Sequence, residues 1–310
     1  MRRRTFIGAA FSGLSLTGLY AKPPKPRVGD IPKRPFGRTG VELTVIGQGG
    51  ARLELMRKRD DARAHVKRAF ELGINYFDCA HSYWDGMSEQ VYGDVLKDVR
   101  KEVFITSKST MRTAEEATKE LDTSLKRLKT DYVDLWQMHA IGTAEDLEKI
   151  FAPGGAVEAF EWAKQQGKCR FTGFTGHHDP DVMLQLLKQY DHFDSVLMPL
   201  HAADPSYQSF EKGVLPVVLE RRMVVQGMKN FGNAFLLRAL NPKECLSYVL
   251  SLPIHCTAVG CSTLGQLEED VRIAQDFKQL DDKEMVRLRQ QASKGAGALT
   301  GSKLEYWKKQ

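Results

Sequence analysis

Short apolar segments alternate with longer amphipathic stretches along most of this chain. The short segments, such as Ile74–Phe77, Val103–Thr106 and Val133–Trp136, are predicted to be buried strands. Helical periodicity follows them, as in Ala114–Leu128. This alternation is typical of strand–helix units that build a parallel sheet.

The predicted strands end at a regular interval. Their ends fall near residues 47, 78, 108, 139, 175, 199, 228 and 260, roughly thirty residues apart, which is the length of one βαβ unit. Eight units predict a closed (β/α)8 TIM barrel. A doubly wound sheet is less well supported, because Gly47-Gln48-Gly49-Gly50 does not complete the GxGxxG fingerprint expected after its first strand.

The ends of the chain carry additional segments. We expect a signal segment at residues 1–21, a Pro-rich linker at 22–33 and one barrel domain at 34–310. Turn residues at the centre of Arg34–Leu43 predict a β-hairpin that covers the barrel floor. Asp281–Ala292 is predicted to be a last helix, followed by a Gly-rich tail to Gln310.

Composition narrows the function class. The 310 residues are 42% hydrophobic and 27% charged, with a net charge of +6, which describes an ordinary globular protein. No basic stripe with interleaved aromatic residues is present, so nucleic acid binding has little support. The five cysteines are odd in number and form no CxxC pair, so we expect core thiols rather than a disulfide framework or a zinc site.

The N-terminal segment has the features of a targeting sequence. Arg2-Arg3-Arg4 precedes the apolar stretch Phe6–Leu19, which is shorter than the roughly 20 residues that span a bilayer. The arrangement resembles a twin-arginine export signal and predicts a periplasmic protein. A membrane anchor or an unstructured tail is the alternative. A cut after Ala21 would have Leu19 at the position where a small residue is preferred, so whether the segment is cleaved stays open.

Four polar residues follow three successive predicted strands. They are Asp78 and Tyr83, Lys108, and His139. Barrel enzymes place their chemistry at the C-terminal ends of strands, so these side chains are expected to meet. Asp78 is the natural partner of a buried Lys108 ammonium, and the positive charge beside Tyr83 is expected to lower the pKa of that phenol. Tyr83 would then protonate a carbonyl oxygen that His139 orients.

At this point the chain resembles the aldo-keto reductase superfamily over about residues 34–290. The family pattern of an Asp and a Tyr five residues apart, then a strand-terminal Lys and a strand-terminal His, is matched by the four residues above. Gly86-Met87-Ser88-Glu89 is similar to the family's GxSE helix start. The resemblance implies an oxidoreductase that moves hydride between NADP(H) or NAD(H) and a small carbonyl or alcohol substrate.

The resemblance also implies a cofactor site and a substrate site. The cofactor positions are Gly49, Asp78, Thr175, Gly176, Met228, Lys229, Gly260, Cys261, Ser262, Thr263, Gln266, Glu269 and Asp270. The substrate positions are Trp84, His139 and His177. The chain departs from the family pattern at several positions: Thr175-Gly176 replaces Ser-Asn, Leu197 replaces a Gln, His201 replaces an Asn, and Gln266 replaces the Arg that grips a 2′-phosphate. The preference between NADP(H) and NAD(H) therefore stays open.

Two other functions fit the same fold. A metal-dependent hydrolase is conceivable because His81, His139, His177, His178 and His201 all lie near strand ends. A non-catalytic barrel that binds a nicotinamide cofactor as a sensor or partner subunit is the second alternative. Substrate identity would depend on the loops Ile141–Ala156 and Ala202–Ser209 and on the C-terminal tail.

Overall fold

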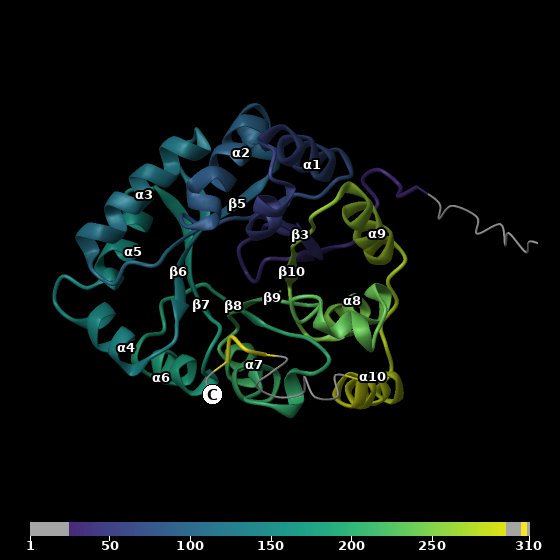
Figure 1. Ribbon diagram of the computed structural model, residues 1–310. Coiled ribbons are helices and arrows are strands. Elements are labelled where there is room, and N and C mark those ends of the chain that lie inside the picture. The colour runs from purple at the N-terminus through teal and green to yellow at the C-terminus, as the bar shows by residue number, and fades with distance from the viewer. Residues whose placement is uncertain (1–24, 296–304, 309–310) are drawn as a thin grey trace, which may run out of the picture.

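Eight parallel strands form the centre of the molecule. The computed structural model describes residues 25–295 and 305–308, so the predicted signal segment lies outside the described residues. The strands close into a barrel in the order β10-β3-β4-β5-β6-β7-β8-β9 (Figure 1). Their bounds are β3 Ile46–Gly49, β4 Tyr76–Asp78, β5 Phe104–Ser109, β6 Val133–Ile141, β7 Cys169–Gly176, β8 Ser195–Pro199, β9 Val224–Met228 and β10 Cys256–Val259. The predicted (β/α)8 barrel is confirmed.

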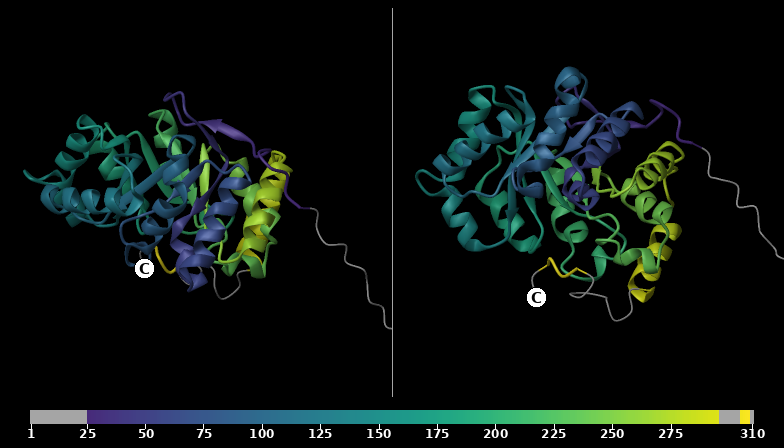
Figure 2. Two further views of the ribbon diagram at one scale, coloured as in Figure 1. Left: turned by 90° about the horizontal axis from the view of Figure 1, so that it is seen from above. Right: turned by 45° about the horizontal axis from the view of Figure 1, so that its top comes forward.

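Helices surround the barrel and cover its outer face (Figures 1 and 2). They are α1 Arg59–Glu71, α2 Met87–Leu96, α3 Ala114–Leu128, α4 Ala144–Phe151, α5 Ala156–Gln165, α6 Pro180–Gln189, α7 Phe210–Glu220, α8 Pro242–Ser251, α9 Leu264–Gln275 and α10 Asp282–Gly295. Among the described residues, none of these helices combines the length and the apolar character that a membrane crossing requires.

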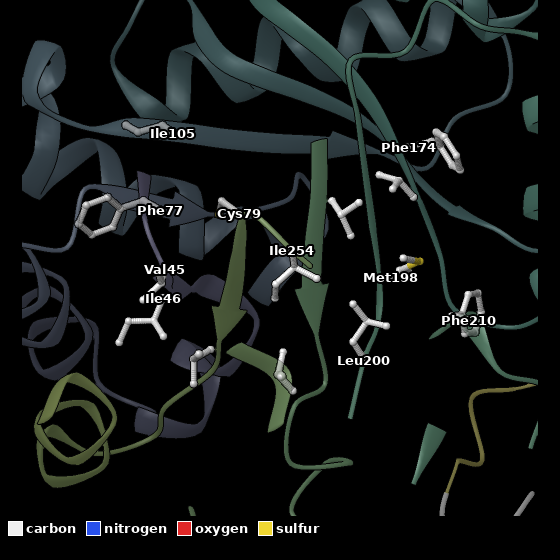
Figure 3. Close-up of a cluster of buried hydrophobic side chains, with 14 of the residues drawn as sticks. Val45, Ile46, Phe77, Cys79, Ile105, Phe174, Met198, Leu200, Phe210 and Ile254 are labelled. Carbon is white, nitrogen blue, oxygen red and sulfur yellow. The ribbon is translucent and has the colours of Figure 1, made fainter. Parts of the chain in front are cut away.

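Alternation along each strand separates the core from the site. Phe77 and Ile105 point outward into the apolar layer between the sheet and the helices, which Figure 3 shows. Asp78 and Lys108, one position away or three, point into the barrel and meet there. Both faces of a barrel strand are buried, so the strands are nearly continuous in burial rather than half exposed.

A β-hairpin closes the N-terminal end of the barrel. Strands β1 (Lys33–Pro35) and β2 (Glu42–Thr44) pair antiparallel, as predicted. Phe36 lies between them and packs on Phe104 and Phe171, with ring centroids 4.8 and 5.5 Å away. Figure 2 shows the hairpin and the described residues 305–308 at opposite ends of the barrel. The hairpin therefore leaves the C-terminal ends of the strands open.

The loop predicted between β6 and α5 contains a helix. Helix α4 begins after Thr143, whose side chain accepts a hydrogen bond from the backbone N–H of Asp146, while the Asp146 carboxylate accepts from the N–H of Thr143. This capping box satisfies two free donors of the first turn. The expectation of a loop over Ile141–Ala156 is thus wrong for Ala144–Phe151, the half of the segment that forms this helix.

All five cysteines are buried and free, as expected for core thiols: Cys79, Cys169, Cys245, Cys256 and Cys261.

Candidate functional site

Four polar side chains from separate segments meet at the C-terminal end of the barrel. Asp78 ends β4, and Lys108 and His139 lie near the ends of β5 and β6. Tyr83 begins a short 3-10 helix, η2 (Tyr83–Gly86), in the loop that follows β4. The structure therefore brings together the four residues that the strand-end pattern predicted.

Lys108 is the centre of this group. Its side chain is fully buried, and its Nζ lies 2.8 and 2.9 Å from the two carboxylate oxygens of Asp78. The same ammonium donates to the carbonyl of Cys79 at 2.6 Å and to the hydroxyl of Tyr83 at 3.5 Å. Burial alone would lower the pKa of Lys108, but the Asp78 charge reverses this and raises it above its ordinary value. Lys108 is therefore a permanent cation.

The acidity of Tyr83 differs from the sequence-based expectation. Burial raises the pKa of Tyr83 to about 12, and the nearby Lys108 charge offsets only part of this effect. The prediction that Lys108 and Asp78 would bring this pKa below its ordinary value is wrong, because desolvation of a phenolate inside the barrel outweighs one adjacent cation. Tyr83 is protonated throughout the physiological range.

Two histidines, His139 and His177, lie next to this group of polar residues. The ring centroid of His139 lies 5.7 Å from that of Tyr83 and 5.9 Å from that of His177. Burial, helped by the positive charges of Lys108, Arg112 and Lys229, lowers the pKa of His139 to about 3. Burial likewise lowers the pKa of His177 well below its usual value. Both rings are neutral at pH 7, and each carries one N–H that can donate to an oxygen.

A cleft of about 370 Å³ opens beside Tyr83 and runs from β4 toward α9. Many of the residues predicted for cofactor or substrate contact line it, namely Gly49, Asp78, His177, Met228, Lys229, Gly260, Ser262, Gln266, Glu269 and Asp270. Leu197, which stands in place of the family's Gln, also lines it. The cleft thus joins the two predicted sites.

Other predicted contact residues lie behind the cleft wall in the described part of the chain. Thr175 is buried, and its hydroxyl oxygen accepts the backbone N–H of Ala140. Gly176 packs against Met183. Cys261 donates its S–H to Asp270 at 3.1 Å, and Thr263 caps α9 by accepting the N–H of Gln266. These four residues support the cleft without lining it.

Sequence reasoning missed Arg52 and several residues of the segment after β9. Arg52 belongs to the 3-10 helix η1 (Gly50–Met56), and its guanidinium donates to Asn233 at 3.0 Å across the cleft. Asn230, Phe231 and Leu237 are further lining residues. The glycine-rich end of β3 was the available signal for Arg52, because a chain that turns there must pass the barrel mouth.

Arg52 and Lys229 bring two positive charges to the cleft, which Asp78, Glu269 and Asp270 also line. Neither cation forms an ion pair within residues 25–295 and 305–308, although Lys229 lies 4.7 Å from the ring of Trp307. Burial, with a smaller contribution from Arg52, lowers the pKa of Lys229 to about 8. Two cations that share a cleft without a carboxylate partner form a receptor for an anion.

The last described residues return to the barrel mouth. Lys308 is buried and donates to Asp204 at 2.7 Å, and Glu305 lies 2.9 Å from the Nε2 of His201. Tyr306 accepts a hydrogen bond from Asn233. Trp84, predicted to contact substrate, is half-buried and packs on the apolar core beside Tyr83, outside the cleft wall.

Metal binding has no visible basis in the described residues. Within that part of the chain, no three His, Cys, Asp or Glu side chains are grouped closely enough to hold a metal ion. The histidines that motivated the hydrolase hypothesis have different neighbours: His201 faces Glu305, whereas His139 faces Tyr83.

Comparison with known proteins identifies relatives. The model of the Aldo/keto reductase family matches residues 45–244. L-galactose dehydrogenase of Arabidopsis thaliana is 35% identical over 293 residues, covering 81% of this chain and 90% of the plant protein. The uncharacterized oxidoreductase YqkF of Bacillus subtilis is 30% identical over 209 residues, a match that spans 62% of each protein.

A solved structure gives the same picture of the fold. The holo form of an aldo-keto reductase from Bacillus halodurans superimposes with a TM-score of 0.72 at 25% sequence identity. The alignment covers 87% of this chain and 98% of that structure.

Proposed function

Because this chain belongs to the aldo-keto reductase family, an NAD(P)-dependent oxidoreductase family, we propose that it moves hydride between a nicotinamide cofactor and a carbonyl or alcohol, with Tyr83 as general acid and base. The observation that carries this assignment is the contact of the Tyr83 hydroxyl with the buried Lys108 ammonium, 3.5 Å apart at the edge of the cleft.

The cleft suits a dinucleotide. Arg52 and Lys229 offer positive charge to its phosphates. Gly49 and Gly260 bring the backbone close, since a Cβ on Gly49 would lie 3.0 Å from the carbonyl oxygen of Val259 and one on Gly260 would lie 2.6 Å from Arg52. When bound, NADP(H) or NAD(H) supplies or accepts the hydride. Ser262 and Gln266, which line the cleft near the start of α9, would hold the adenosine end of the cofactor.

Tyr83 supplies the proton in reduction. An alkoxide is a much stronger base than a phenolate, so even a phenol whose pKa is about 12 protonates it readily. In the reverse direction the Lys108 charge stabilises the phenolate that accepts the alcohol proton. Tyr83 therefore works as an acid that stays protonated at neutral pH.

His139 and Asp78 assist from opposite sides. The neutral His139 ring donates an N–H toward an oxygen held near Tyr83, which orients the carbonyl and polarises it. Asp78 keeps Lys108 charged and in place without touching the substrate. His177 lines the cleft beside His139, and we assign it to the substrate side. Trp84 packs on the core next to Tyr83, and we assign it to the support of that residue rather than to direct substrate contact.

The substrate class is a small carbonyl compound or its alcohol, and a sugar is the first candidate to test. L-galactose dehydrogenase is the relative matched over most of both chains, and the neutral His139 and His177 offer hydrogen bonds that hydroxyl groups can use.

The proposal is tested by cofactor titration followed by a substrate panel. Protein fluorescence is titrated with NADPH and NADH, and turnover is then measured with methylglyoxal, simple aldehydes and ketones, and L-galactose. We expect micromolar binding of at least one cofactor and turnover of at least one substrate. Absence of cofactor binding would overturn the assignment. Tight binding without turnover on the whole panel would favour the non-catalytic alternative.

We further propose that residues 1–21 direct export, on the basis of Arg2-Arg3-Arg4 and the short apolar stretch that follows. The full chain should fractionate with the periplasm of a bacterial host, and Arg3→Lys with Arg4→Lys should retain it in the cytoplasm. Equal distribution of both forms would contradict export by this route.

A further inference from the structure

A layer of polar side chains fills the barrel directly below Asp78, and the reaction proposed above does not use it. Tyr76, Gln137 and Gln226 come from β4, β6 and β9, and all three are fully buried. Tyr76 precedes Asp78 by two residues on the same strand, so both side chains point inward. An apolar layer would be the ordinary filling of a barrel interior, so three polar residues here call for a reason.

These side chains form one continuous chain of hydrogen bonds. Nε2 of Gln137 donates to Oε1 of Gln226 at 2.9 Å, and Nε2 of Gln226 donates to the hydroxyl of Tyr76 at 2.8 Å. The Tyr76 hydroxyl then donates to Oδ1 of Asp78 at 3.4 Å. The chain therefore crosses the barrel and ends on the carboxylate that holds Lys108.

The negative charge of Asp78 fixes the direction of every bond in this chain. A carboxylate only accepts, so the hydroxyl proton of Tyr76 must point toward Asp78. The oxygen of Tyr76 is then free only to accept, which requires the amide N–H of Gln226 to face it. All donors thus point the same way, and in a buried, low-dielectric interior such an aligned chain stabilises the charge at its end.

The ring of Tyr76 is held independently of its hydroxyl. It packs in the apolar cluster of the barrel floor, with its centroid 6.2 Å from that of Phe104. Gly47 on the neighbouring strand leaves the necessary room, because any Cβ there would collide with the Tyr76 ring. The floor therefore anchors the ring, and the hydroxyl reaches upward from a fixed base.

We propose that Tyr76, oriented by Gln226 and Gln137, is a positioning residue that holds the Asp78 carboxylate in the orientation that keeps the Lys108 ammonium against the Tyr83 hydroxyl. The inference rests on the proposed function of Tyr83. Asp78 also accepts a hydrogen bond from the Thr106 hydroxyl at 3.1 Å. Both of its carboxylate oxygens contact the Lys108 ammonium. Tyr76 is the link that ties this carboxylate to the rigid floor, whereas Thr106 ties it to the adjacent strand.

Loss of the Tyr76 hydroxyl is expected to make Tyr83 a weaker acid. The Asp78 carboxylate would turn more freely, which weakens the hold on Lys108, and its charge would be less neutralised by donors. Both effects disfavour the Tyr83 phenolate and raise the pKa of Tyr83.

The test is Tyr76→Phe in the full chain, which removes one oxygen and keeps the ring in the floor. With methylglyoxal and NADPH, or L-galactose and NADP⁺ if only the sugar is turned over, we expect kcat to fall roughly tenfold. The KM and the NADPH dissociation constant should stay within about twofold. The limb of the kcat profile that reports the Tyr83 hydroxyl, which is the alkaline limb in reduction and the acidic limb in oxidation, should move to higher pH. Tyr248→Phe is the matched control, because it removes another buried hydroxyl, bonded to Glu211 and Arg289 away from the site.

A second variant tests whether the chain acts as a unit. Gln226→Leu leaves Tyr76 in place and removes its donor, so it should shift the pH profile in the same direction. The Tyr76→Phe and Gln226→Leu double variant should be no slower than the slower single variant, since both act through one path. Multiplicative losses would show independent effects and overturn the proposal.

The outcomes separate this inference from the function on which it rests. A parental kcat and pH profile in Tyr76→Phe, with turnover lost in Tyr83→Phe, would refute the positioning role alone. Unchanged turnover in Tyr83→Phe would refute the proposed function itself. A drop in thermal stability with proportionate losses of cofactor binding and turnover, matched by Tyr248→Phe, would reduce Tyr76 to a structural residue and overturn the inference.

Discussion

The ammonium of Lys108 lies 3.5 Å from the hydroxyl of Tyr83 and 4.9 Å from the centre of its ring. Among the described residues, no other cation is seen in contact with that phenol. Because Lys108 is fully buried and Tyr83 is partly buried, water screens their interaction less than it would at the surface. The charge therefore acts on Tyr83 while Asp78 holds the ammonium in place.

Lys108→Met should abolish most turnover and destabilise the fold. Removal of the ammonium leaves the Asp78 carboxylate buried without its partner, which costs about 3–5 kcal/mol in the free energy of unfolding. Chemical denaturation measures this loss. The double variant with Asp78→Asn removes the stranded charge, so it should recover much of the stability while turnover stays low. Recovery of turnover together with stability would mean that Lys108 has no role in the chemistry.

The affinity for NADPH should fall as pH rises from 7 to 9. The pKa of Lys229 is lowered to about 8, so its side chain is charged below this pH and loses its charge above it. An anionic ligand prefers the charged form, and we expect about fivefold weaker binding over this range. Fluorescence titration at each pH measures the change. Lys229→Arg keeps its charge and should bind equally at both pH values, whereas a slope that persists in Lys229→Arg would exclude Lys229 as its source.

Asp270→Asn should become more stabilising as pH rises. Burial raises the pKa of Asp270 from its usual value near 3.8 to about 7, with the Cys261 hydrogen bond opposing this shift only in part. A carboxyl with a raised folded pKa binds its proton more tightly in the native state, so stability falls as pH rises from about 4 to 7. The advantage of Asp270→Asn in free energy of unfolding should grow by on the order of 2 kcal/mol between pH 5 and 7.5. If the free energies of unfolding of the two proteins changed in parallel with pH, the raised pKa of Asp270 would be contradicted. Asp276→Asn, at the exposed end of α9, is the control.

The barrel and the catalytic group could be predicted from the sequence because both depend on local patterns. Short apolar runs mark the strands, and the strand ends carry Asp78, Lys108 and His139. Parallel strands in a barrel then bring those ends together without further information. Helix α4 also has a local signal, the pair Thr143 and Asp146, although it lies within a segment expected to be a loop.

The remainder depends on burial and loop conformation, which sequence does not display. The pKa of Tyr83 rises because desolvation of the partly buried phenol outweighs the effect of the visible lysine. Arg52 joins the cleft only because η1 turns over the barrel mouth toward Asn233. Thr175 points to the backbone of Ala140, which has a φ of 54° beside a register shift between β6 and β7. Such irregularities decide which side of a strand end faces a ligand.

The most direct measurement of the central claim is the turnover of Tyr83→Phe beside its affinity for NADPH. The substitution removes the proposed proton donor and keeps the ring, so kcat should fall by about 10²–10⁴-fold, while the NADPH dissociation constant stays within about twofold. Tyr132→Phe, at the opposite end of the barrel before β6, should match the parent. A Tyr83→Phe protein that binds NADPH and turns over at the parental rate would contradict the assignment of Tyr83 as the acid.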